Sequence, residues 1–171
     1  MFNQFYSDLP ELNQAFLDGF EHFNNKNFHA AIEKFSIAIK SEGRKSGYFN
    51  KYLSFISLCE ILNGDRSSLN ILREIASSDC CDSDIYCNLA IAEFVSKHRR
   101  RAFAAISKGQ SIGTDHNGLE LLYEILDTRR PPIISFLSRN NPINVALGKL
   151  SYKLKNSDFK SCDEYLWSYM N

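Results

Sequence analysis

Two helices can be read directly from Leu12–Lys40, LNQAFLDGFEHFNNKNFHAAIEKFSIAIK. Apolar side chains recur there every three or four residues, which is the period of an amphipathic helix. The polar run 24–27 interrupts this pattern and predicts the turn between the two helices. Ser7 or Asp8 is the predicted N-cap of the first helix, with Pro10 in its opening turn. The stretch therefore predicts an antiparallel helical hairpin.

Small residues follow a regular spacing in this hairpin. Gly19 in the first helix is followed twelve positions later by Ala31 in the second helix, and then by Phe35 and Ala38. Small side chains allow antiparallel helices to approach closely, and an aromatic ring fills the space between neighbouring hairpins. At these positions the stretch resembles a tetratricopeptide repeat (TPR).

The same pattern recurs twice further along the chain. The second copy has Ile56 in place of Gly19 and is degenerate, with its inter-helix turn at Gly64. The third copy restores the small pair as Ala90 and Ala102. The first offset between copies is 37 residues and the second is 34, and 34 residues is the repeat length of the TPR family.

The resemblance implies an all-α fold, a right-handed α-solenoid of TPR-like helical hairpins. We expect residues 1–171 to form a single domain. Within it, residues 12–114 would form three TPR-like hairpins, and residues 115–171 a degenerate repeat with extra C-terminal capping helices. Residues 118–127 read as a further first helix, whose normal partner is interrupted by the proline pair 131–132.

Composition and charge narrow the function classes. A length of 171 residues and a near-average composition favour a globular chain. Residues 1–96 carry eight Lys and Arg against thirteen Asp and Glu (net −5), whereas residues 97–171 carry twelve against seven (net +5). Neither a secretory signal nor a membrane span is recognisable. We therefore expect a cytoplasmic protein with reduced cysteines, which are Cys59, Cys80, Cys81, Cys87 and Cys162.

Patterns typical of catalysis, metals or cofactors are missing from the sequence. Its four histidines fit no HExxH motif, and it has no CxxC pair. Its eight glycines form no GxxxxGK or GxGxxG loop, and GxSxG is also missing. We therefore expect no metal, no cofactor and no enzymatic activity.

The TPR resemblance also implies a place for a partner. In that family the first helices of successive hairpins line a concave groove that holds a partner peptide. A mostly apolar lining suits a hydrophobic peptide or an amphipathic helix, although aromatic stripes at helical spacing also occur as plain core. The implied lining residues are Asn13, Phe16, Phe20, Phe23, Asn50, Leu53, Ser57, Glu60, Asp84, Cys87, Ile91 and Phe94.

In layout the chain is similar to the small bacterial chaperones that keep type III secretion translocators soluble. This likeness implies an adaptor or chaperone that binds another protein or peptide segment. The charge asymmetry between the two halves also allows contact between copies of the chain, and hence a homo-oligomer.

The basic C-terminal half supports an alternative, a factor that binds nucleic acid or an acidic partner. The basic run 98–101 has no interleaved aromatics that could stack on bases, which makes nucleic acid the less favoured partner. Arg129, Arg130 and Arg139 form a second predicted contact surface, for an acidic partner. The other interpretation of these arginines is a proline-stiffened cap with solvated charges.

Overall fold

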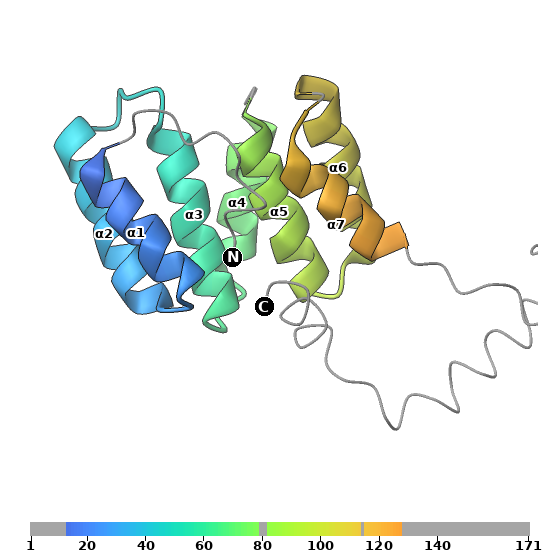
Figure 1. The fold of residues 1–171 in the computed structure, drawn as a ribbon, viewed down its shortest axis with the longest axis horizontal. Coiled ribbons are helices and arrows are strands. Elements are labelled where there is room, and N and C mark those ends of the chain that lie inside the picture. Colours follow the sequence, from blue (N-terminus) through green and yellow to red (C-terminus); the bar gives the residue numbers. More distant parts are fainter. Residues whose placement is uncertain (1–12, 79–81, 114, 128–171) are drawn as a thin grey trace, which may run out of the picture. The chain divides into compact units, whose positions relative to one another are not determined.

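The computed structural model describes residues 13–78, 82–113 and 115–127. Within these ranges the chain forms seven α-helices and no strand, which confirms the predicted all-α class (Figure 1). None of these seven helices is both long and apolar enough to cross a membrane. The helices are α1 (Gln14–Asn24), α2 (Phe28–Glu42), α3 (Phe49–Leu62), α4 (Ser68–Ser77), α5 (Ser83–Val95), α6 (Arg99–Ile112) and α7 (Asn117–Asp127).

The described helices belong to one compact unit, except for the last residue of α7. The predicted C-terminal cap lies outside the described residues, and the single domain stays a prediction.

The helix boundaries follow the sequence pattern closely. α1 ends at Asn24 and α2 begins at Phe28, so the polar run between them forms the predicted turn. Gly64 lies in the turn between α3 and α4, with a positive φ of 105° that glycine adopts without strain. The run of arginines that begins at Arg99 opens α6, and the further first helix expected before the proline pair is present as α7.

The N-cap of α1 differs from the prediction. Asn13 occupies this position, and its side-chain oxygen accepts a hydrogen bond of 2.9 Å from the backbone N–H of Ala15. The prediction of Ser7 or Asp8 as the cap was therefore wrong. An asparagine oxygen caps a helix as well as serine or aspartate does, so composition could not decide between the three sites.

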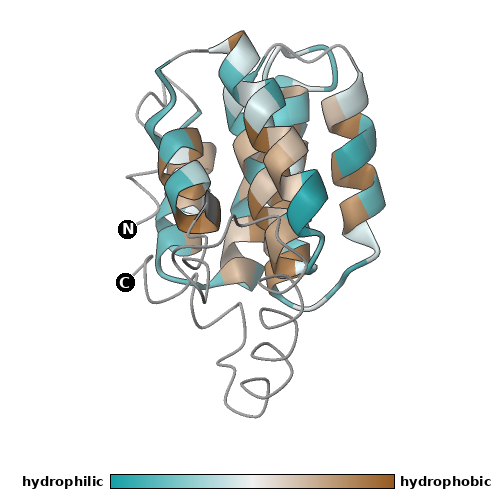
Figure 2. Cartoon of the chain, turned by 90° about the vertical axis from the view of Figure 1, so that its right-hand side faces the viewer, coloured by the Kyte–Doolittle hydropathy of each residue, from teal (hydrophilic) through white to brown (hydrophobic). Residues whose placement is uncertain are grey.

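The described helices lie in two layers. Consecutive helices pack on each other from α1 to α6, and α3 also contacts α5. In Figure 1, α1, α3, α5 and α7 lie in front of α2, α4 and α6. Figure 2 shows the most hydrophobic helices in the middle and more polar ones at the sides. α3 and α5, which contact each other and helices of the other layer, are thus buried on several sides.

Helices approach closely where the sequence has small residues. A Cβ atom at Gly19 would lie 2.7 Å from the ring of Phe35, which is itself fully buried. At Gly109 a Cβ atom would lie 2.6 Å from the side chain of Leu119. Since these gaps are shorter than van der Waals contact, only glycine fits both positions without repacking.

Six aromatic rings fill the space between α1, α2 and α3. The ring centroid of Phe55 lies within 6.0 Å of the rings of four phenylalanines. Burial of this many rings supplies much of the stability of the first hairpin and of its contact with α3. We call this set the aromatic core, and it consists of Phe16, Phe20, Phe23, Phe35, Tyr52 and Phe55.

Candidate polypeptide-binding groove

Most of the residues predicted to line a groove are buried. The buried ones are Phe16, Phe20, Phe23, Ser57, Asp84, Cys87 and Ile91. The partly exposed ones are Asn13, Asn50, Leu53, Glu60 and Phe94. The predicted groove is therefore corrected for the buried set, because a partner cannot reach side chains that pack within the helical layers. Substitution of Phe16 and Phe20 would test the core and not a binding surface.

Asp84 belongs to a buried cluster of charged groups. One carboxylate oxygen, Oδ2, lies 2.6 Å from Lys51 Nζ, and the other, Oδ1, lies 2.8 Å from His116 Nε2. Lys51 Nζ also lies 3.2 Å from an oxygen of Asp82. These contacts join α3, α5 and the segment that precedes α7, so the cluster holds helices together.

The pKa values of this cluster are shifted by two opposing effects. Burial alone would raise the pKa of Asp84, but the hydrogen bond with His116 and the charge of Lys51 outweigh burial and hold that pKa below its ordinary value. Burial alone would lower the pKa of Lys51, but Asp84 and Asp82 raise it above its ordinary value. Asp84 and Lys51 are therefore charged at neutral pH and neutralise each other.

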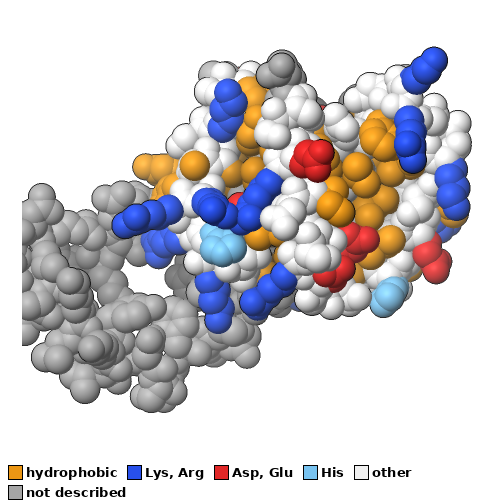
Figure 3. All heavy atoms as spheres, turned by 180° about the vertical axis from the view of Figure 1, so that it is seen from behind, with side chains coloured by type: hydrophobic (Ala, Val, Ile, Leu, Met, Phe, Trp, Pro, Cys, Tyr) orange, Lys and Arg blue, Asp and Glu red, His pale blue; other side chains and the backbone are white. Residues whose placement is uncertain are grey.

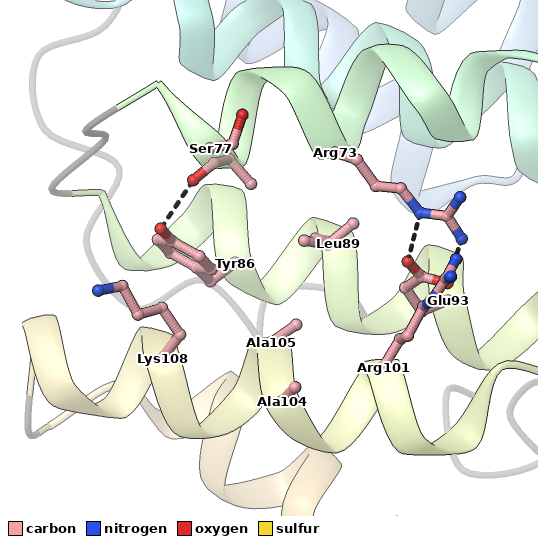
Figure 4. Close-up of a pocket in the computed structure, with 10 residues that line it drawn as sticks. Arg73, Ser77, Tyr86, Leu89, Glu93, Arg101, Ala104, Ala105 and Lys108 are labelled. Atoms are coloured by element: carbon pink, nitrogen blue, oxygen red, sulfur yellow. Dashed lines mark hydrogen bonds and ion pairs between the residues drawn. The ribbon is translucent and has the colours of Figure 1, made fainter.

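An open groove of about 460 Å³ lies over α5, between α4 and α6 (Figure 4). α4 and α6 each pack on α5 and form the two walls of the groove. We call this feature the α4–α6 groove. Its apolar lining consists of Ala76, Tyr86, Leu89, Ala104 and Ala105. Its polar lining consists of Arg73, Ser77, Glu93, Arg101 and Lys108.

The α6 wall has a regular arrangement of small and basic residues. Arg101, Ala104, Ala105 and Lys108 stand at positions i, i+3, i+4 and i+7, which lie on one face of a helix. Ala104 is exposed and Ala105 is buried. Because alanine has a short side chain, the middle of this wall leaves space in the groove. A basic residue stands at each end of the wall.

Glu93 forms the one acidic part of the groove lining. Its carboxylate accepts hydrogen bonds from Arg73 Nε at 2.7 Å and Nη2 at 2.9 Å, and lies 2.9 Å from His98 Nδ1. Burial alone would raise the pKa of Glu93, but hydrogen bonds from Arg73 and His98 hold it below its ordinary value. The hydrogen bond to Glu93 in turn raises the pKa of Arg73. Glu93 is thus an anion that Arg73 already neutralises.

The remaining basic side chains of the groove lining are those of Arg101 and Lys108. Arg101 and Lys108 make no ion pair with any residue in 13–78, 82–113 and 115–127. Figure 3 shows Lys and Arg gathered beside apolar surface on the face that carries α4 and α6. The groove therefore combines an apolar floor with unneutralised positive charge at its edge.

Sequence reasoning missed the α4–α6 groove. The TPR resemblance predicts that a partner binds to the first helix of each hairpin. The walls of this groove are α4 and α6, which are the second helices of the predicted hairpins. The one usable signal was a helical face with Arg101 and Lys108 at its ends and alanines between them. The other wall depends on the ion pair between Arg73 and Glu93, which stand 20 residues apart and follow no local pattern.

Other predicted sites lie partly outside the described residues. Arg129, Arg130 and Arg139 are outside them, so the second contact surface stays a prediction. Cys59 and Cys87 are buried, and burial raises the pKa of the Cys59 thiol. The part of the chain that the structure describes contains no group of three or more His, Cys, Asp or Glu that could hold a metal ion.

No family model, no curated protein and no solved structure matches this chain.

Proposed function

We propose that this protein is a protein–protein interaction module, a right-handed α-solenoid of TPR-like hairpins that holds a segment of another polypeptide. The packing of consecutive helices supports the proposal, as does the close approach of Gly19 to Phe35. The spacing of the three sequence copies, 37 and then 34 residues, supports it further. Its role would be that of an adaptor or chaperone in the cytoplasm, with no catalysis of its own.

The observation that carries the proposal is the apolar floor of the α4–α6 groove. Apolar surface left in water costs about 25 cal/mol per Å², so a partner that covers the floor gains free energy of binding. Apolar depressions rimmed by polar groups are typical of binding sites. A segment that lies in this groove would cover Leu89 and Ala104 and pass beside the basic edge.

A substitution that fills the groove tests the proposal. Ala104 is exposed, so Ala104→Trp places a large ring in the groove without disturbing the core. Peptides selected on the full chain from a displayed random library should lose most of their affinity for this variant. Ser107→Trp is the matched control, because Ser107 is exposed on the same helix but does not line the groove. Equal binding to both variants would contradict the proposal.

Nucleic acid is a second candidate ligand, favoured by the exposed side chains of Lys97, Arg99, Arg100 and Arg101. Contacts to phosphates release counterions, so this function predicts an affinity for single-stranded DNA that falls steeply between about 50 and 200 mM salt. Fluorescence anisotropy with a labelled oligonucleotide measures this directly. Peptide binding that persists in the presence of excess oligonucleotide favours the polypeptide partner.

A further inference from the structure

We infer that the α4–α6 groove selects an acidic amphipathic helix, whose carboxylates seven residues apart pair with Arg101 and Lys108. This inference rests on the proposed function and specifies its partner. The charge of the groove lining, the spacing along α6 and the hydrogen-bonding needs of an occupant support it.

Charge favours an acidic occupant. The lining contains three basic side chains and one carboxylate, a formal excess of two positive charges. Glu93 is 2% exposed and already bonded to Arg73, so the carboxylate and one of the basic groups neutralise each other. The excess charge therefore resides on Arg101 and Lys108, and opposite charge on the partner is what such an edge recognises.

The spacing along α6 favours a helix. Arg101 and Lys108 are seven residues apart, or about 10.5 Å along the helix axis at 1.5 Å per residue. A partner helix that lies along α6 presents residues i and i+7 at the same separation. Its carboxylates at these positions can therefore reach both basic groups at once, while its apolar stripe covers Ala104 and Leu89.

Hydrogen bonding also favours a helix over an extended peptide. The walls of the groove are helices, whose backbone groups bond within each helix. An extended segment would find few backbone partners over a floor of alanine and leucine, and its own N–H and C=O groups would be left unpaired when water is excluded. A helical segment satisfies these groups internally.

The lining does not favour nucleic acid. Its one aromatic residue is Tyr86, which is buried and whose hydroxyl donates a hydrogen bond to the carbonyl of Ala76 at 2.8 Å. Bases bind single-strand sites by stacking on exposed rings. The α4–α6 groove offers alanine and leucine instead.

The test uses a displayed library of 15-residue peptides with a constant leucine stripe and with Glu, Lys or Gln varied at the flanking positions. The full-length wild-type protein should enrich glutamates that are seven residues apart. Arg101→Glu with Lys108→Glu should bind those peptides about tenfold more weakly and enrich lysine instead. Because both side chains are exposed, the fold should persist, and Arg101→Gln with Lys108→Gln gives a milder second variant.

Arg100→Glu is the control for charge reversal on α6, because it reverses one positive charge at a residue that does not line the groove, against two reversals in the test variant. It should enrich the same peptides as the wild type. Binding without a charge preference, or without the seven-residue spacing, would overturn the inference and leave the proposed function intact. Failure of the wild type to bind any peptide would overturn both. Displacement of bound peptide by an oligo(dT) strand would assign the surface to nucleic acid and overturn the inference.

Discussion

Phe55 is the residue on which the aromatic core depends most. It is fully buried, and its ring lies within 6.0 Å of the rings of four phenylalanines from α1 and α2. Phe55→Ala should therefore lower the free energy of unfolding by about 3–5 kcal/mol, because it removes apolar burial and leaves a cavity. Urea unfolding followed by circular dichroism measures this. Ile37→Ala, at a side chain that is 51% exposed, should change stability by less than about 0.5 kcal/mol.

Gly19 and Gly47 give a matched pair of glycine substitutions. A Cβ atom at Gly19 would lie 2.7 Å from Phe35, whereas nothing lies within 4 Å of one at Gly47. Gly19→Ala should lower stability by about 1–2 kcal/mol, since overpacking a buried ring outweighs the gain in helix propensity. Gly47→Ala should be neutral or stabilising by up to about 1 kcal/mol, because alanine reduces the conformational entropy of the unfolded chain. Thermal unfolding of both variants distinguishes them, and equal effects would refute a close contact at Gly19.

Asp84 should make stability depend on pH in acid. The pKa of Asp84 in the folded protein is below the ordinary value of 3.8. The contribution of Asp84 to the free energy of unfolding is therefore fully present above the pKa of the unfolded state, and it is lost as the pH falls through the pKa of the folded state. Asp84→Asn should therefore cost about 3 kcal/mol at pH 7, because it leaves Lys51 with weaker pairing. The difference from wild type should shrink as pH falls below about 4.

Urea titrations at several pH values between 2.5 and 7 measure this difference. Asp115→Asn is the control, because Asp115 is exposed. It should give a small change at every pH. A cost of Asp84→Asn that is independent of pH would contradict the role given to the ion pairs of Asp84.

At the scale of elements, α6 begins with charges that oppose its own dipole. Arg99, Arg100 and Arg101 occupy its first turn, where the helix dipole favours negative groups. Arg99 is compensated, because its guanidinium donates to the carbonyl of Leu126 near the end of α7. Arg100 and Arg101 have no such contact among the described residues. The N-terminal turn of α6 is therefore less stable than it would be with acidic residues at these positions.

Arg100→Glu should stabilise the protein by about 0.3–1 kcal/mol, because it replaces a positive with a negative charge at the start of α6. Arg100→Gln should give about half of this effect. The midpoints of chemical unfolding at low salt measure both variants. A destabilised Arg100→Glu variant would show that Arg100 makes a stabilising contact that the described residues do not contain.

The helices themselves could be predicted from the sequence, because their pattern is local. The polar run after Asn24 and the glycine turn at Gly64 mark helix ends within a few residues of chain. The binding surface could not be predicted in this way. Whether the stripe of Phe16 and Phe20 faces a partner or the core depends on which helix covers it, and contact between α2 and α3 closes the space around these rings.

At the scale of the whole described region, α5 is held on two sides by ion pairs. Asp84 near its start binds Lys51 of α3, and Glu93 near its end binds Arg73 of α4. Both carboxylates are buried and both pKa values are lowered. The ion pairs thus join α5 to α3 and to α4, and α5 forms the floor of the groove between α4 and α6.

Hydrogen–deuterium exchange of the full chain, with and without a library-selected peptide, shows whether a polypeptide binds over α5, between α4 and α6. Bound peptide should slow exchange in α4, α5 and α6, including the segments around Arg73, Leu89 and Ala104, and leave the amides of α1 and α2 unchanged. Protection confined to α1 and α3, or no protection of α6, would contradict the claim.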